Sequence, residues 1–167
     1  MTNVVDDLLG QNEWANLRII EACRALADEQ LDATAVGAYG SVRTTLVHML
    51  GAEQQYIRDL GGRPTGPDLR RGFPGWVALE AAARLNASDL VHRLRLTLDT
   101  TVTKTFEDDT REEIEAGVLL VQAINHGAEH RSQICTILTT LRATPPEIDG
   151  WAWAEAEGRI RVVEGSA

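Results

Sequence analysis

Two histidines four residues apart, His126 and His130, lie in the segment INHGAEHRSQI at residues 124–134. In a helix, side chains at positions i and i+4 project from the same face, about 6 Å apart along the axis. Two such imidazoles can fill two positions of a metal site, and their borderline-soft nitrogens suit zinc, nickel, copper or iron better than magnesium or calcium. A third ligand must come from elsewhere in the chain.

His48 is the histidine best placed to supply that third ligand. It lies in residues 41–60, at the edge of an apolar stripe formed by Leu46, Leu50 and Ile57. Three protein ligands leave one coordination position open for water or substrate, as in catalytic zinc sites, whereas structural sites are closed by four ligands. The histidines therefore predict an open, three-ligand metal site.

Two other interpretations of these histidines stay open. His126, Glu129 and His130 also spell HxxEH, the pattern of inverzincin peptidases, in which the glutamate is the general base. Such a peptidase needs a further ligand well downstream in a larger scaffold, and only residues 131–167 follow His130. Alternatively, a histidine in a helix can simply make one hydrogen bond, which is the interpretation we adopt for His92.

Four amphipathic segments must position the histidines. Apolar residues recur at helical spacing over residues 3–28, 41–60, 76–97 and 111–141. Ser41 is placed to cap the second segment, and Thr110 with Glu113 forms a capping-box pattern before the fourth. The sequence therefore predicts a single all-α domain over residues 1–167, a four-helix bundle in which facing helices can share a metal.

The connections between these helices differ in character. Residues 61–75, GGRPTGPDLRRGFPG, are too rich in glycine and proline for regular structure, so we expect a long loop that is either a lid over the site or a plain crossover. The threonine-rich residues 96–109 predict an irregular or extended connection. After Pro145 and Pro146 end the last helix, we expect a tail packed over the bundle by Trp151 and Trp153.

Composition argues against several classes of partner. The net charge is −9 and no run of basic residues occurs, so a nucleic-acid partner is not expected. No stretch approaches the roughly 20 apolar residues of a membrane span, and the N-terminal MTNVVDDLLG lacks the features of a signal peptide. Cys23 and Cys135 are isolated within helical patterns, which predicts buried free thiols in a reducing cytoplasm.

Three segments of the chain resemble the DinB/YfiT-like family of metal-dependent bundles. They are TLVHMLGAEQQYI around His48, INHGAEHRSQI with His126, His130 and Arg131, and PEIDGWAW after the last long helix. The resemblance implies an up-down-down-up four-helix bundle and a divalent metal, zinc or nickel, held by His48, His126 and His130. It also implies a homodimer.

The resemblance gives an architecture but no single reaction, because members of such a family can differ in chemistry. Some relatives resemble S-transferases that use the low-molecular-weight thiols mycothiol or bacillithiol, and others are isomerases or hydrolases. A three-histidine metal with an open position can keep a thiol deprotonated at neutral pH. We therefore expect transfer of such a thiol to an electrophilic small molecule, with Arg63, Arg70 and Arg71 as candidate anchors for its polar groups.

Two other functions remain open at this point. A hydrolase using metal-bound hydroxide would need a general base, and Glu53 and Glu129 are the nearest candidates by sequence. A binding protein that only uses the metal for stability would need no base. The sequence assigns no catalytic residue beyond the three expected metal ligands.

Overall fold

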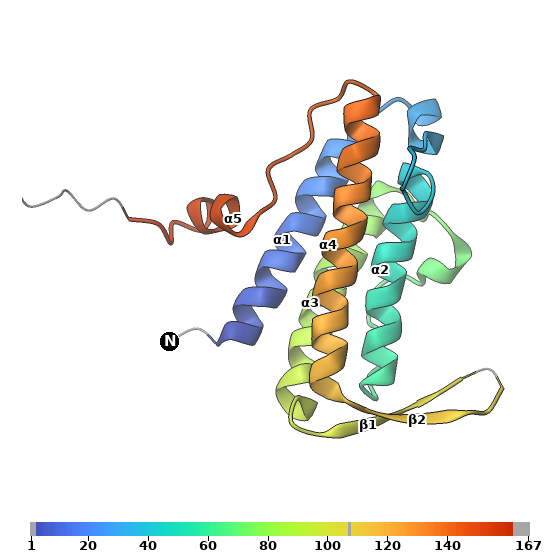
Figure 1. Cartoon of the computed structure of the whole chain (residues 1–167), viewed down its shortest axis with the longest axis vertical. Coiled ribbons are helices and arrows are strands. Elements are labelled where there is room, and N and C mark those ends of the chain that lie inside the picture. Colours follow the sequence, from blue (N-terminus) through green and yellow to red (C-terminus); the bar gives the residue numbers. More distant parts are fainter. Residues whose placement is uncertain (1–2, 107, 162–167) are drawn as a thin grey trace, which may run out of the picture.

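The computed structural model describes residues 3–106 and 108–161, and four long helices dominate it (Figure 1). The long helices are α1 (Val4–Arg24), α2 (Val42–Asp59), α3 (Trp76–Thr97) and α4 (Ala116–Thr140). The short elements are η1 (Asp28–Asp32), η2 (Leu69–Arg71), β1 (Thr101–Thr105), β2 (Arg111–Glu115) and α5 (Gly150–Ala156). The predicted all-α four-helix bundle is confirmed.

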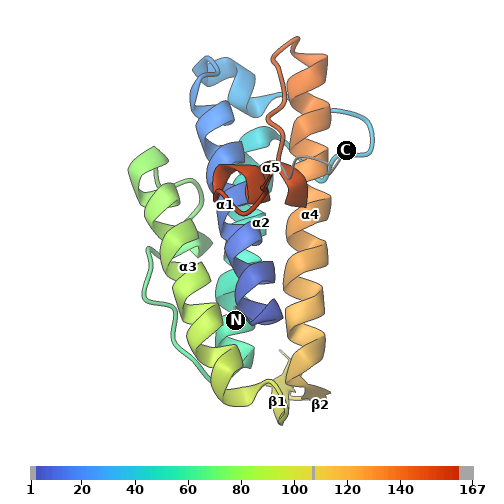
Figure 2. The ribbon, with the colours of Figure 1, turned by 90° about the vertical axis from the view of Figure 1, so that its left-hand side faces the viewer.

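The four long helices run up, down, down and up. Each of α1 and α2 packs against both α3 and α4, so the order around the bundle is α1, α3, α2, α4. The helices α2 and α3 point the same way because the chain between them returns along the length of the bundle (Figures 1 and 2). This return is the predicted long crossover, which contains only the single turn η2. As a result α2 and α4, the two helices that carry the histidines, are antiparallel neighbours.

Local signals set the ends of α2. The Ser41 hydroxyl accepts a hydrogen bond from the Thr44 N–H at 3.2 Å, which confirms the predicted cap. At the other end Gly62 N–H donates to the Ile57 carbonyl and Gly61 N–H to the Arg58 carbonyl, both at 2.8 Å. This is the Schellman arrangement, and it requires a left-handed residue, supplied by Gly61 at φ 72°. The helix that carries His48 therefore has a fixed start and a fixed stop.

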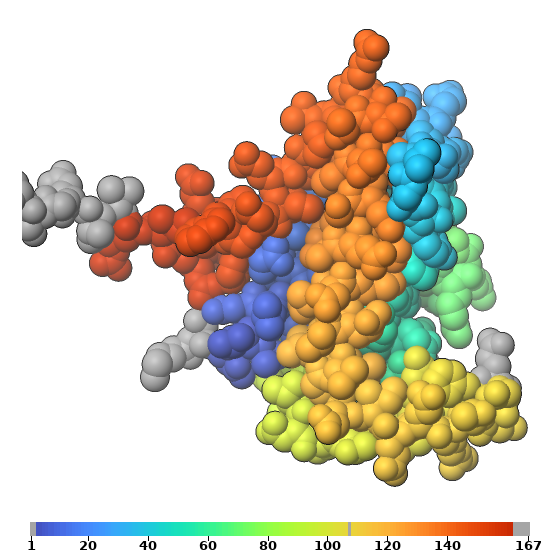
Figure 3. All heavy atoms as spheres, viewed as in Figure 1, coloured from blue at the N-terminus to red at the C-terminus, as the bar shows by residue number. Residues whose placement is uncertain are grey.

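The predicted start of the fourth helix at residue 111 is wrong. Residues 111–115 form strand β2, which pairs antiparallel with β1, and α4 begins five residues later at Ala116. The hairpin extends beyond the base of the bundle (Figures 1 and 3). Two cross-strand pairs favour it. Lys104 lies opposite Glu112, and the paired Val102 and Ile114 pack against an apolar cluster that includes Ile57 and Leu90. Pairing with a β-prone threonine strand outweighs the local capping-box signal.

A polar layer divides the core into two apolar clusters. The upper cluster includes Ile19, Leu46, Leu79 and Ile137, and the lower includes Leu9, Ile57, Leu90 and Leu119. Between them every long helix places a buried polar residue. These residues are Asn12 and Asn16 on α1, Glu53 on α2, Asn86 on α3 and Arg131 on α4.

The tail packs on the bundle less closely than expected. Helix α5 lies beside α1 (Figures 1 and 3), and Trp153 is close enough that a Cβ at Gly10 would lie 3.7 Å from its ring. Trp151, in contrast, is 77% exposed. The prediction that both tryptophans cover the bundle therefore holds for Trp153 and is wrong for Trp151, since a seven-residue helix buries only one side.

Candidate metal centre

The three histidines predicted as ligands converge in space. His126 Nε2 lies 3.2 Å from His48 Nε2 and 3.1 Å from His130 Nε2, and one nitrogen from each ring lies within 4.8 Å of the others. A tetrahedral zinc with metal–nitrogen bonds of about 2.0–2.1 Å requires ligand nitrogens about 3.3 Å apart. The cluster therefore has the donor type and nearly the spacing that a divalent transition metal needs.

The packing of α2 against α4 creates this convergence. His126 and His130 project from the same face of α4, one turn apart, and that face meets α2 at His48. His130 is 5% exposed, while the other two rings are half-buried. The cluster is thus closed on the core side and reachable from outside on the His48 and His126 side.

Gln133 fixes the orientation of His130, the most buried of the three predicted ligands. His130 Nδ1 lies 2.8 Å from Gln133 Oε1, and the same oxygen accepts a hydrogen bond from the Tyr39 N–H at 3.2 Å. The amide nitrogen of Gln133 faces Glu129 Oε1 at 3.5 Å, so all three contacts agree on the amide orientation. Because an amide oxygen only accepts, His130 carries its proton on Nδ1 and keeps the Nε2 lone pair for a metal.

The environment favours the neutral form of two of the three histidine rings. Burial lowers the pKa of His48, and the neighbouring His130 lowers it further. Burial, with the charges of His130 and His48, lowers the pKa of His126 to about 4. A neutral imidazole presents a lone pair and a protonated one does not, so these shifts suit a cation at neutral pH.

Tyr39 covers the cluster from the chain that precedes α2. Its ring stacks on His48 with 4.0 Å between centroids and 14° between planes, and its edge meets His130 at 5.3 Å. On the other side, the Tyr56 ring meets His126 edge-on at 6.1 Å. The sequence did not point to Tyr39 or Gln133, because neither belongs to a recognisable motif. The Gln133 spacing of three residues from His130 is the only signal that could have indicated it.

The buried polar layer lies beside the cluster. Glu53 Oε1 accepts hydrogen bonds from Asn12 Nδ2 at 2.8 Å and Asn16 Nδ2 at 2.9 Å, and Asn86 Nδ2 donates to its other oxygen at 3.2 Å. Burial raises the pKa of this carboxyl although the asparagines and Arg131 oppose the rise. With its oxygens occupied and 3% exposure, Glu53 is a structural group of the core, which argues against the general-base role considered from sequence.

Arg131 links this layer to the turn of α4 that carries the ligands. Its Nη1 donates to both Asn12 Oδ1 and Asn16 Oδ1 at 2.7 Å. Burial lowers the pKa of Arg131 to about 10, so the guanidinium stays charged at neutral pH. A Cβ on Gly127 would lie 2.6 Å from Asn12 Oδ1 and 2.8 Å from Arg131 Nη1. Only glycine fits there, between His126 and His130, without displacing the layer.

Two adjoining pockets open at the cluster and share Val47 and His48. The first, called here the Phe73 pocket, has a volume of about 320 Å³ and is lined by Tyr39, Arg43, Thr44, Val47, His48, Gly72 and Phe73. The second, called the Tyr56 pocket, has a volume of about 520 Å³. Its lining is Val47, His48, Gly51, Ala52, Gln55, Tyr56, Leu69, Arg70, Gln122 and His126. The long loop therefore borders the site at residues 69–73, as expected of a substrate-contacting segment.

The other residues singled out in the sequence lie in different places. Of the three loop arginines only Arg70 lines either of these two pockets, and its Nε and Nη2 each donate to the Asp68 carboxylate at 2.9 Å. Glu129 is exposed on α4, and the third histidine of the cluster comes from α2, upstream of the HxxEH pattern. This arrangement argues against the peptidase interpretation. His92 is exposed on α3, outside the described cluster.

The cysteines are both free, and burial raises the pKa of the buried Cys23 to about 12. Cys135 is half-buried, with its pKa also raised by burial. Neither belongs to the described metal-ligand cluster.

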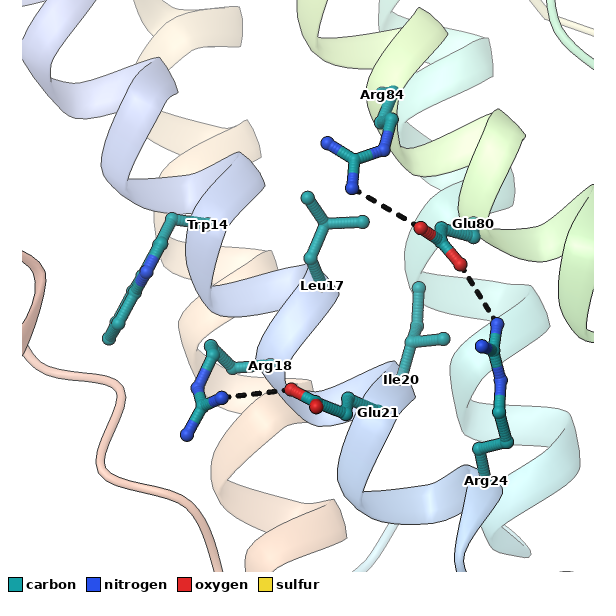
Figure 4. Close-up of a pocket in the computed structure, with 8 residues that line it drawn as sticks. All are labelled: Trp14, Leu17, Arg18, Ile20, Glu21, Arg24, Glu80 and Arg84. Carbon is teal, nitrogen blue, oxygen red and sulfur yellow. Dashed lines mark hydrogen bonds and ion pairs between the residues drawn. The ribbon is translucent and has the colours of Figure 1, made fainter. Parts of the chain in front are cut away.

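A separate pocket of about 280 Å³ lies between α1 and α3, away from the histidines (Figure 4). Its charged side chains pair with one another: Glu80 bridges Arg24 at 2.9 Å and Arg84 at 3.2 Å, and Arg18 contacts Glu21 at 2.8 Å. With these cations paired, the pocket has the character of an ion-pair network between helices.

Fold and cluster together define a four-helix-bundle protein with three histidines that could hold a divalent metal. The model of the DinB family matches residues 1–161, and the chain belongs to that family. A comparison with curated proteins gives no match. Within the described residues, the helices are too short or too polar to cross a membrane.

Proposed function

We propose that this protein binds zinc or nickel through His48, His126 and His130 and transfers a low-molecular-weight thiol to an electrophilic small molecule. The observation that carries the proposal is the convergence of the three histidines beside two open pockets: His126 Nε2 lies 3.2 Å from His48 Nε2 and 3.1 Å from His130 Nε2, and one nitrogen of each ring lies within 4.8 Å of the others. When bound, the metal would supply the positive charge that keeps a thiol deprotonated at neutral pH. The chain itself would orient the ligands and hold the two reactants.

The reaction is a substitution at carbon. The thiol loses its proton to solvent, its sulfur attacks the electrophilic carbon, a C–S bond forms, and the leaving group departs with the electron pair of the broken bond. Gln133 holds His130 in the tautomer that presents Nε2, and Tyr39 covers the ligand rings on one side. The loop residues Leu69 and Phe73 border the pockets and supply apolar surface to them.

Hydrolysis by metal-bound hydroxide is the second candidate. It would be helped by a general base, but the described residues that line the two pockets include no carboxylate. Glu53 is enclosed by asparagines and Glu129 is exposed and contacts Gln133. The absence of a suitably placed base among these residues favours thiol transfer.

The test begins with metal analysis of the purified protein, followed by conjugation of 1-chloro-2,4-dinitrobenzene with mycothiol, bacillithiol or no thiol. We expect about one metal per chain and thiol-dependent conjugation. His126→Ala should lose the metal, and the matched control His92→Ala, which alters an exposed histidine, should keep it. Unchanged metal content in His126→Ala overturns the metal site. A metal-loaded protein that hydrolyses esters and forms no conjugate overturns thiol transfer.

The homodimer implied by the family resemblance and the cytoplasmic location expected from the two isolated cysteines remain predictions. Light scattering after size-exclusion chromatography tests the first, and cell fractionation tests the second.

A further inference from the structure

We propose that the two pockets beside the histidines are separate subsites for two substrates. The Phe73 pocket binds an apolar aromatic electrophile, and the Tyr56 pocket binds the neutral, hydroxyl- and amide-bearing body of the thiol. This inference rests on the proposed thiol transfer and goes beyond it by assigning a substrate class to each side of His48.

The Phe73 pocket has aromatic walls and a neutralised cation. The Tyr39 ring is held against His48 by stacking, and the Phe73 ring is held by an edge contact with Trp76 at 5.0 Å and by the Arg43 guanidinium 5.2 Å from its centroid. Flat rings placed in this way favour an aromatic ligand, because aromatic side chains pack against aromatic rings in stacked or edge-on geometry.

Arg43 does not make this pocket an anion site. It is the only charged side chain in the described lining, and its guanidinium contacts Asp28 at 3.0 Å and Asp32 at 3.1 Å. The two carboxylates offset its charge and hold it in place over Phe73. A ligand therefore meets apolar surface with a fixed ion pair behind it, which suits an uncharged aromatic compound.

The Tyr56 pocket offers hydrogen bonds from neutral groups. Gln55 and Gln122 are exposed at its rim, and the Tyr56 hydroxyl is hydrogen-bonded to Gln122. Arg70 is already paired with Asp68 through two contacts of 2.9 Å. The rest of the lining is mainly apolar and includes Val47, Ala52 and Leu69. The rim groups, which can both donate and accept, are therefore the ones that would hold a polyhydroxyl or amide-bearing body.

The shared residues explain why two reactants would meet here. His48 and Val47 line both pockets, whereas His126 lines only the Tyr56 pocket. A thiol in the Tyr56 pocket therefore reaches two of the three ligand histidines, and an electrophile in the Phe73 pocket lies beside His48, the histidine that both pockets share. Hydrolysis would require a site for only one organic substrate, so two pockets of different lining favour transfer between two.

The test measures binding of each substrate class separately by titration calorimetry. The aromatic probe is 2,4-dinitrotoluene, an unreactive analogue of 1-chloro-2,4-dinitrobenzene, and the thiol probe is mycothiol, each added to the metal-loaded protein. Phe73→Ala should weaken binding of the aromatic probe about tenfold and leave the affinity for mycothiol unchanged. The double variant Gln55→Ala with Gln122→Ala should weaken binding of mycothiol and leave the affinity for the aromatic probe unchanged. The control is Arg71→Ala, on the same loop but outside both described linings.

A second variant tests the same pocket in case Phe73→Ala does not fold, since Phe73 also contacts the core. Thr44→Trp adds bulk at an exposed residue of the Phe73 pocket and should exclude the aromatic probe while removing no core contact. If thiol conjugation occurs but these variants leave aromatic binding unchanged, or weaken both probes equally, the subsite assignment is wrong and thiol transfer stands. If mycothiol does not bind the metal-loaded wild type, thiol transfer itself fails.

Discussion

Gln133 Oε1 lies 2.8 Å from His130 Nδ1 and also accepts the backbone N–H of Tyr39. One amide therefore connects a predicted metal ligand on α4 to the ring that covers His48. In metal sites such an outer partner fixes the tautomer and orientation of the histidine, and its loss commonly costs 10- to 100-fold in affinity.

Gln133→Ala should weaken metal binding by about 10- to 100-fold while leaving the helix intact, because His130 loses the acceptor that fixes its tautomer. Competition with a chelator of known affinity measures the change. The matched control is Ser132→Ala, the exposed neighbouring position on α4. Equal affinity in wild type and Gln133→Ala would show that this contact does not orient the ligand.

Glu53→Leu should lower the free energy of unfolding by about 3 kcal/mol or more. The change leaves the side-chain donors of Asn12, Asn16 and Asn86 without their acceptor and removes the charge that offsets Arg131. Urea unfolding measures this loss. The control is Gln55→Ala, at an exposed site on the same helix, whose free energy of unfolding should lie within about 0.5 kcal/mol of wild type.

Glu53→Gln tests the pH dependence of the same group. The folded pKa lies above the ordinary value of 4.5, so the folded state binds more protons than the unfolded state. The free energy of unfolding should therefore fall as pH rises from 4.5 through the folded pKa. The glutamine variant should lack this decrease, and an identical pH profile for the two proteins would contradict the assigned shift.

The two glycines of α4 should respond oppositely to alanine. Gly127→Ala places a Cβ 2.6 Å from Asn12 Oδ1, so we expect a loss of about 1–3 kcal/mol in unfolding free energy and weaker metal binding. At Gly117 the nearest atom to a Cβ is 4.0 Å away, and Gly117→Ala should stabilise the helix by about 0.5 kcal/mol. Thermal unfolding of both variants provides the comparison. Equal stability would show that Gly127 has no steric role.

Acid should destabilise the metal-free protein through His126. Its pKa of about 4 lies below the ordinary 6.5, so the unfolded state binds more protons between these values and stability rises with pH across that window. Urea unfolding of metal-free wild type and His126→Asn at pH 4.5 to 7 measures the difference. A titration of His126 near pH 6.5 by NMR would contradict the shift.

The sequence alone determined the helical framework. Helical spacing of apolar residues predicted α1, α2 and α3 closely. The prediction that Ser41 caps α2 was correct, and the glycine- and proline-rich residues 61–75 form the predicted long loop. These are local properties, set by backbone freedom and by side-chain periodicity. The i, i+4 spacing of His126 and His130 is equally local, so two of the three histidines could be paired without a structure.

Tertiary contacts decided the rest. Residues 111–115 carry a helix-start pattern, yet they pair with residues 101–105, which become neighbours only when the chain turns back. The sequence left Glu53 as a candidate general base, because the asparagines that enclose its carboxylate lie on α1 and α3, 33 to 41 residues away in sequence. Gln133 and Tyr39 acquire their roles in the same way. Periodicity and capping fix helices one at a time, whereas packing of α2 against α4 brings His48 to His126 and His130.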